Sequence, residues 1–315
     1  MKYRKLGNSG LLVSELSIGS WLTFGNYIDD IKSNEIVKTA YELGINNFDT
    51  ANVYENGKAE ELISHSLKDY SRDTYIISTK AYFPIGPWPT QKGLSKKHLT
   101  DQVNTSLKRM NLDYIDIFYC HRFDINSSVE ETLRTLENLV RQGKILYIGV
   151  SKWTVEQMKK ALEVADKYLL ERIVVNQPPY NLLNRKIENN VIPWCSNNGI
   201  SQIVYSPLAQ GVLSGKYLSG SLNSGRTTVK NLDLSPAVLT KVQKLVDLSN
   251  NLDLNPAQLS LAWILNNPNI TSAIIGASEK EHVIGNIRAI DVKLSQEVLQ
   301  SLDEIFMEKE EEIFK

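Results

Sequence analysis

The sequence predicts an α/β fold in which eight parallel strands close into a (β/α)8 barrel of the TIM type. Eight short apolar segments each lead into a segment with the spacing of an amphipathic helix, which is typical of a parallel sheet with helical crossovers. The 315 residues suit one such barrel, and no change in composition marks a second domain. We therefore expect residues 1–315 to form a single domain. An open doubly wound sheet is disfavoured because no G-x-G-x-x-G motif follows the first strand.

The strands are expected where short apolar runs end at polar residues. Before the barrel, the turn residues Asn8, Ser9 and Gly10 predict a small hairpin. The barrel strands are expected at residues 15–18, 46–49, 75–79, 115–120, 146–150, 173–176, 202–205 and 271–275.

Capping residues indicate where the helices begin. Helices are expected from Ser33 to a stop at Gly44, over residues 60–67, over residues 96–110 behind Ser95, and over residues 186–197. Capping boxes are predicted by Ser128-x-x-Glu131, Thr154-x-x-Gln157 and Ser278-x-x-Glu281. Two further helices should begin with a cap followed by proline, at Ser235-Pro236 and Asn255-Pro256, and an acidic-basic helix should end the chain.

Composition and charge exclude several classes of protein. A formal net charge of -1 favours neither nucleic acid nor an anionic membrane as a partner. The two cysteines, Cys120 and Cys195, are too few for a secreted disulfide framework, and we expect both to be buried apolar residues. The N-terminal string MKYRKLGNSG lacks the apolar core of a signal peptide, and no apolar run approaches the roughly 18 residues of a membrane helix. We expect a reduced, cytoplasmic protein, with homo-oligomerisation left open.

Polar and aromatic residues stand directly after the predicted strands, where the loops of such a barrel build its active site. Asp49 and Tyr54 follow the second strand, Lys80 follows the third and His121 the fourth, and we call these four residues the tetrad. A free phenol has a pKa of about 10, too high for an efficient proton donor near neutrality. We expect the Lys80 ammonium to lower the pKa of Tyr54, Asp49 to hold Lys80, and His121 to hydrogen-bond a carbonyl oxygen. A cofactor would have to supply hydride.

Each member of the tetrad also has a simpler interpretation. Asp49 can be a turn former, Tyr54 a packing residue, Lys80 a cation that reaches solvent, and His121 a structural hydrogen-bonding residue. Their coincidence on successive strand ends favours the chemical interpretation.

The strings that carry the tetrad also resemble a known family. FDTANVYENGKAE, STK, CHR, GVSKW, NQPPYN, YSPLAQGVLSGKY and GAS resemble, in this order, the aldo-keto reductase superfamily over most of the chain. GSWLTFG and IIGAS are most similar to its bacterial and archaeal branch, which is related to the potassium-channel β-subunits. The resemblance implies an NADPH-dependent oxidoreductase that reduces aldehydes or ketones, with Tyr54 as general acid and Asp49, Lys80 and His121 as its partners.

The resemblance also implies a cofactor site. The nicotinamide end would be held by Ser20, Trp21, Ser151, Lys152, Gln177 and Tyr205. The pyrophosphate would lie on Ser206, Leu208, Gln210, Gly211 and Lys216, under a long cofactor-covering loop at residues 211–235. The adenosine and its 2′-phosphate would meet Arg226, Gly276, Ser278, His282 and Asn286.

Several positions depart from the family pattern. Lys152 stands where many relatives have Asn, and His282 stands where relatives often have Gln. Arg226 and Lys280 favour a 2′-phosphate, whereas Glu279 and Glu281 oppose one, so we rank NADPH above NADH without excluding NADH.

The substrate is expected to be a small aldehyde or ketone. The walls of the substrate pocket would be formed by Trp21, Tyr54, His121, Arg122 and the loop at residues 82–94. Trp88 would lie either over the substrate or against a neighbouring subunit. No metal site is predicted.

Two other functions are compatible with the sequence. One is a cofactor-binding regulatory subunit resembling the channel β-subunits; the other is a Schiff-base aldolase that uses Lys80. We expect the reductase, because His121 completes the tetrad and the sequence shows no long partner-binding N-terminal extension.

Overall fold

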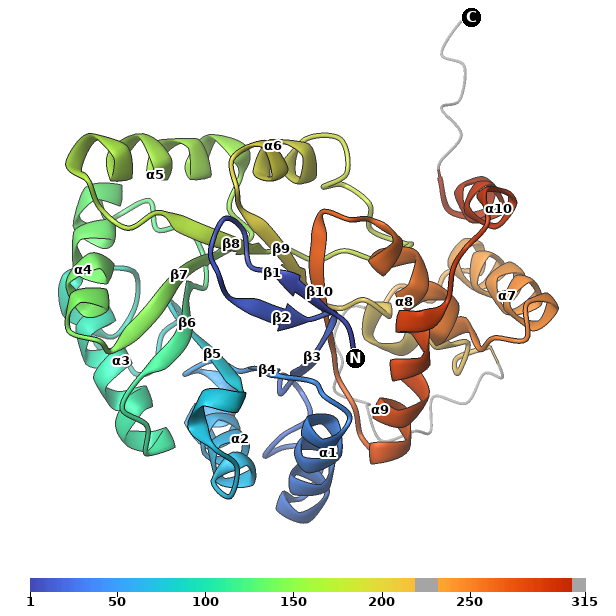
Figure 1. Cartoon of the computed structure of the whole chain (residues 1–315), viewed down its shortest axis with the longest axis horizontal. Helices are drawn as coiled ribbons and strands as arrows, with labels where there is room; N and C mark the ends of the chain where they lie inside the picture. Colours follow the sequence, from blue (N-terminus) through green and yellow to red (C-terminus); the bar gives the residue numbers. More distant parts are fainter. Residues whose placement is uncertain (219–231, 308–315) are drawn as a thin grey trace, which may run out of the picture.

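The computed structural model describes residues 1–218 and 232–307, in which eight parallel strands close into a barrel (Figure 1). Each strand pairs with its successor, and the last strand pairs with the first. The (β/α)8 barrel is thereby confirmed. Its strands are β3 (Leu16–Gly19), β4 (Asn47–Asp49), β5 (Ile76–Ala81), β6 (Ile115–Cys120), β7 (Ile145–Ser151), β8 (Ile173–Gln177), β9 (Ser201–Val204) and β10 (Ile270–Ile275).

The predicted N-terminal hairpin, β1 (Tyr3–Lys5) and β2 (Leu12–Ser14), closes one end of the barrel. Leu6 and Val13 pack against the apolar residues inside the barrel, among them Tyr119 and Val175. The Asn8 N–H donates to a backbone carbonyl that precedes β9, with N and O 3.0 Å apart. The hairpin therefore covers the amino ends of the strands, and the carboxyl ends stay available for a site.

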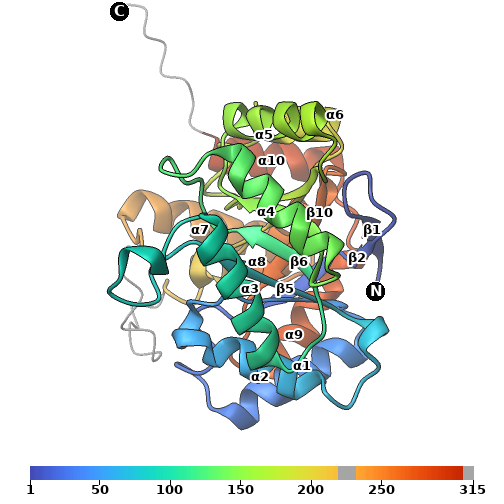
Figure 2. The same ribbon diagram turned by 90° about the vertical axis from the view of Figure 1, so that its left-hand side faces the viewer.

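Helices surround the strands, and Figure 2 shows the hairpin and α7 on opposite sides of the molecule. The strands β5 and β6 are buried along their whole length, because side chains fill the barrel on one face and helices cover the other. The helices are α1 (Asp30–Glu42), α2 (Lys58–Leu67), α3 (Lys96–Met110), α4 (Val129–Arg141), α5 (Val155–Tyr168), α6 (Val191–Asn197), α7 (Pro236–Asn251), α8 (Pro256–Asn266), α9 (Lys280–Ile287) and α10 (Gln296–Phe306).

Several helices begin elsewhere than predicted. Helix α2 begins at Lys58, two residues before the predicted start at residue 60. Helix α1 begins at Asp30, because Asp29 rather than Ser33 is the cap and accepts from the Lys32 N–H at 2.8 Å. Helix α6 begins only at Val191 instead of residue 186, behind Asn190 as cap.

The predicted capping boxes have different outcomes. Thr154 and Gln157 form the full reciprocal box at α5. Ser128 caps α4, but the carboxylate of Glu131 accepts from the backbone of α3 instead, so that box is incomplete. The prediction for Ser278 is wrong: Glu279 is the cap residue of α9, without a side-chain hydrogen bond. Ser235 and Asn255 cap α7 and α8 as expected.

Cys120 and Cys195 are free and buried, as the composition predicted. Burial raises the pKa of each thiol to about 12, so neither is a thiolate nucleophile near neutrality. Among the described residues, no helix has the length and apolarity needed to cross a membrane.

A buried ion pair fixes the segment that carries Tyr54. This segment is the short 3-10 helix η1 (Tyr54–Gly57), which leads directly into α2. Arg109 of α3 lies against Gly57, where a Cβ atom would fall 2.3 Å from the guanidinium carbon. The guanidinium also pairs with the fully buried Glu60, whose other carboxylate oxygen accepts from Thr79 at 2.6 Å.

Arg109→Ala should therefore destabilise the fold. The change leaves the Glu60 carboxylate buried without its cation, which costs about 3–5 kcal/mol in comparable sites. Denaturant unfolding measures the loss. Arg134→Ala is the matched control, because its pair with Glu130 is exposed on both sides and should contribute little to stability. Equal losses in the two variants would contradict this interpretation.

Candidate active site

The barrel brings the tetrad together at the carboxyl ends of neighbouring strands. Asp49 ends β4, Lys80 lies next to the end of β5, and His121 directly follows β6. Tyr54 begins η1, five residues beyond the end of β4. Asp49, Tyr54 and His121 line one cleft of about 800 Å³, and Lys80 lies fully buried behind them.

The Lys80 ammonium and the Asp49 carboxylate form a buried ion pair with nearly every valence satisfied. Nζ of Lys80 donates to Asp49 Oδ1 at 2.5 Å and to the carbonyl oxygen of Thr50 at 2.7 Å. The other carboxylate oxygen of Asp49 accepts from Ser78 Oγ and from Gln177 Nε2, both at 2.9 Å. Because both charges are paired and hydrogen-bonded, the pair can persist at a site from which water is excluded.

Tyr54 lies over this pair, and its pKa is shifted in the direction opposite to the predicted one. Its ring centroid is 5.3 Å from Lys80 Nζ and 5.9 Å from the ring centroid of His121. Burial and the Asp49 carboxylate raise the pKa of the phenol well above its ordinary value. The expected lowering of this pKa by Lys80 is not found: Arg122 is the cation that lowers it, and burial, which disfavours the phenolate, outweighs Arg122. Tyr54 therefore keeps its proton.

His121 is a neutral imidazole in this setting. Burial is the main cause, and the nearby cations Lys80 and Arg122 add to it, so that the pKa of His121 falls to about 2. Within the described residues, its Nδ1 atom is buried without a hydrogen-bond partner. A neutral imidazole carries one N–H donor and one acceptor, so His121 can hydrogen-bond a ligand without carrying charge.

Most of the residues that the resemblance assigns to the cofactor line the same cleft. They are Trp21, Ser151, Gln177, Tyr205, Ser206, Leu208, Gln210, Gly211, Lys216, Gly276, Ser278, His282 and Asn286. Ser20 and Lys152 do not line it: Ser20 is buried and donates to the Asp49 carbonyl oxygen at 3.1 Å. Arg226 lies outside the described residues, as does most of the loop at residues 211–235.

The segment after β9 has a backbone suited to phosphate. Ser206, Ala209 and Gln210 have left-handed φ angles of 52°, 46° and 57°, and Gly211 follows with φ 93°. The left-handed φ of Gly211 favours glycine at this position. Successive residues of this kind turn N–H groups toward one concave side, which is a common anion-binding arrangement. The cleft therefore fits an elongated, phosphate-bearing cofactor.

Ser151 and Gln177 make protein contacts as well as lining the cleft. The Gln177 amide donates to Asp49, and Ser151 Oγ donates to the Gln177 backbone carbonyl at 2.9 Å. Their predicted contact with a carboxamide stays a prediction, and it would join the cofactor site to the tetrad through one side chain.

The structure adds wall residues that the sequence did not single out, and it places one predicted residue elsewhere. Leu22, Tyr27 and Ala257 also line the cleft. Leu22 and Tyr27 follow the first strand, so their position alone was a usable signal, whereas Ala257 at the start of α8 offered none. Trp88 is 68% exposed and does not line the cleft, so its role toward substrate stays a prediction.

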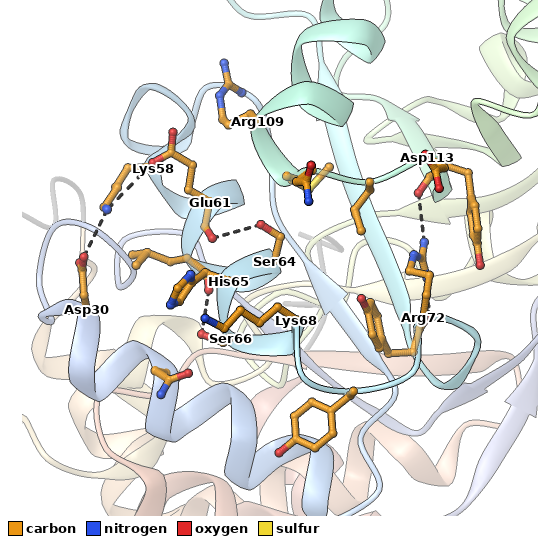
Figure 3. Close-up of a pocket in the computed structure, with 18 of the residues that line it drawn as sticks. Asp30, Lys58, Glu61, Ser64, His65, Ser66, Lys68, Arg72, Arg109 and Asp113 are labelled. Atoms are coloured by element: carbon orange, nitrogen blue, oxygen red, sulfur yellow. Dashed lines mark hydrogen bonds and ion pairs between the residues drawn. The ribbon is translucent and has the colours of Figure 1, made fainter.

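A second cavity, of about 870 Å³, lies outside the barrel beside α1 and α2 (Figure 3). It contains no member of the tetrad. Three of its cations pair with carboxylates of the protein: Lys58 with Asp30, Arg72 with Asp116, and Arg109 with Glu60. These pairs leave it a weaker candidate than the cleft at the barrel mouth.

Comparison with known proteins shows the family to which this fold belongs. The sequence model of the aldo/keto reductase family matches residues 15–306. A probable voltage-gated potassium channel subunit beta of Arabidopsis thaliana is 38% identical over 321 residues, which cover 98% of each chain. A putative voltage-gated potassium channel subunit beta of Schizosaccharomyces pombe is 37% identical over 318 residues, covering 96% of this chain and 92% of the relative.

A relative with an enzyme name is equally similar. The L-glyceraldehyde 3-phosphate reductase of Escherichia coli O157:H7 is 38% identical over 320 residues, covering 96% of this chain and 92% of the relative. The family match spans nearly the whole barrel, and these relatives align over nearly their full lengths. The family match and these relatives, together with the fold, show that the chain belongs to the aldo/keto reductase family.

Proposed function

We propose that this protein is an NADPH-dependent reductase that converts small aldehydes or ketones to alcohols. The observation that carries the proposal is a protonated phenol beside a neutral imidazole, both facing a cleft large enough for cofactor and substrate. The name of the Escherichia coli relative, a reductase of a small aldehyde, supports this class of substrate.

In the proposed reaction, the residues that line the cleft would hold a nicotinamide cofactor, which would supply hydride to the carbonyl carbon. Tyr54 gives its hydroxyl proton to the carbonyl oxygen, so that carbonyl, hydride and proton sum to the alcohol. The N–H group of His121 holds the carbonyl oxygen and steers it toward the phenol. As Tyr54 loses its proton, the adjacent Lys80 ammonium stabilises the phenolate. Asp49 keeps that ammonium in place, and the tyrosine regains a proton before the next turnover.

The arrangement of Lys80 disfavours an aldolase. A Schiff base needs a neutral and reachable amine, whereas Lys80 is fully buried and two of its donors are used by Asp49 and Thr50.

The preference for NADPH rests mainly on Arg226. Lys280, the other predicted cation, lies 3.8 Å from the Glu35 carboxylate, which partly compensates its charge. Arg226 is assigned by the resemblance alone. We also propose a cytoplasmic location, which NADPH-dependent chemistry and two buried free cysteines suit.

A second candidate function is a cofactor-binding regulatory subunit, which the names of the Arabidopsis thaliana and Schizosaccharomyces pombe relatives favour. The two functions differ in turnover. NADPH titration followed by a panel of aldehydes, monitored at the nicotinamide absorbance, separates them: tight binding without turnover of any aldehyde would favour the regulatory subunit.

Tyr54→Phe should lower kcat by about a hundredfold or more, because it removes a positioned general acid. The phenyl ring keeps the packing, so the Kd for NADPH, measured by fluorescence titration, should stay near the wild-type value. Unchanged turnover would exclude Tyr54 as the acid.

His121 should act as a neutral donor at every working pH. Because its pKa lies near 2, the wild-type profile of kcat/KM should show no inflection near pH 6.5. His121→Ala should lower kcat by about 10²–10³, as expected for loss of one oxyanion donor, and His121→Gln should restore part of it. An inflection near pH 6.5 that both variants abolish would show instead that His121 titrates.

Arg226→Ala should raise the Kd for NADPH by about tenfold or more, which is the usual scale for losing a charge-assisted hydrogen bond. NADH has no 2′-phosphate, so its Kd should barely change. Fluorescence titration with both cofactors measures the two constants, and equal weakening would mean that Arg226 does not contact the 2′-phosphate.

A further inference from the structure

Arg122 is a cation of the cleft without a counter-charge among residues 1–218 and 232–307. Arg122 directly follows His121 and lines the cleft. Its Nη1 atom donates to the His121 carbonyl oxygen at 2.5 Å and lies 3.4 Å from Ser151 Oγ. In residues 1–218 and 232–307, its guanidinium forms no salt bridge, and Nε and Nη2 make no hydrogen bond to protein.

The carboxylates that line the cleft either bond other residues or belong to the part of the cleft near α9. Asp49 is paired with Lys80, and Glu55 accepts from the Asn26 amide at 2.8 Å. Glu279 belongs to the start of α9, the part of the cleft assigned to adenosine. The positive charge of Arg122 is therefore not compensated from the described walls.

Arg122 lies beside the proposed reacting centre. Its guanidinium carbon is 5.2 Å from the centroid of the Phe83 ring, and that ring is 4.8 Å from the imidazole of His121. Phe83 also lines the cleft and packs edge-on against His121, so one ring contacts both the cation and the imidazole. Arg122 also lowers the pKa of His121, which shows that its field reaches the reacting centre.

We propose that Arg122 is a specificity-determining residue that binds an anionic group, phosphate or carboxylate, on the carbonyl substrate. This inference rests on the proposed reductase function and narrows its substrate class to acidic aldehydes and ketones. The guanidinium edge with Nε and Nη2 presents two donors in a fixed fork, which matches two oxygens of either anion. With Nη1 held by the backbone of His121, the fork is fixed relative to the carbonyl-binding imidazole. One contact at the anion and one at the carbonyl would orient a small substrate.

Kinetics with matched substrates test the proposal. NADPH-dependent reduction is measured for glyceraldehyde 3-phosphate against glyceraldehyde, and for succinic semialdehyde against butanal. Wild type should have the higher kcat/KM for the anionic member of at least one pair. Arg122→Gln should lower kcat/KM for that anion by about 10- to 100-fold, mainly through KM, the scale for hydrogen bonds to a charged group. For the neutral member it should change kcat/KM by less than about threefold, and Arg122→Lys should restore part of the loss.

The control removes the same charge elsewhere. Arg172→Gln changes an exposed arginine that pairs with Asp166 just before β8, at the opposite end of the barrel from the cleft. This variant should leave kcat/KM unchanged for both members of each substrate pair. The Kd for NADPH should also stay within about twofold in Arg122→Gln, because the proposed ligand is the substrate.

The outcomes separate this inference from the proposed function. An equal loss of kcat/KM for anionic and neutral substrates would mean that Arg122 only positions His121, and it would overturn the inference. Weaker NADPH binding in Arg122→Gln that accounts for the loss would overturn it as well. If wild type reduces none of the four carbonyls, glycerol 3-phosphate and succinate are titrated into the NADP complex by calorimetry. Binding that Arg122→Gln abolishes would keep the anion site while the reductase proposal falls. No binding to wild type would overturn both.

Discussion

The buried pair of Asp49 and Lys80 is the interaction on which the site depends. Two opposite charges inside a barrel would be costly without further hydrogen bonds, and here Thr50 accepts a second proton of the ammonium while Ser78 and Gln177 donate to the carboxylate. The pair also determines the electrostatic surroundings of Tyr54. It places a fixed ammonium under the Tyr54 ring while its carboxylate opposes ionisation of the phenol. The phenol therefore stays protonated at rest, yet a cation is present for the moment when the proton leaves.

Closure of the parallel barrel is what makes this pair possible. Gln177 lies 128 positions beyond Asp49 in sequence, and it reaches the carboxylate only because β8 and β4 face each other across the closed sheet. The N-terminal hairpin seals the other end with Leu6 and Val13. The polar groups at the carboxyl ends are consequently reached from one side, the cleft that also carries the segment after β9 and the start of α9.

The sequence predicted what depends on local pattern and missed what depends on burial. The barrel strands and the box at Thr154 are local features, and both were found, with strand ends that agree within one or two residues. Asp29 and Ser33 are both good cap residues, so only the folded chain decides between them. The pKa of Tyr54 was predicted with the wrong sign, because the charges were known from sequence but the burial of the phenol was not. Phe83 was predicted only as part of the loop that forms a wall, since nothing local shows that its ring packs on His121.

The site separates binding from chemistry, and this bears on why one family contains chains named as reductases and chains named as channel subunits. The residues suited to phosphate come from the segment after β9, whereas the groups that hold or move a proton follow β4, β5 and β6. Gln177, at the end of β8, lines the same cleft and bonds Asp49. Under the proposed function, a change at the position of His121 would remove a donor to the substrate without altering the backbone proposed to hold phosphate. The barrel could then keep its cleft while its proton chemistry is strengthened or lost, and in this chain the tetrad is present and adjacent.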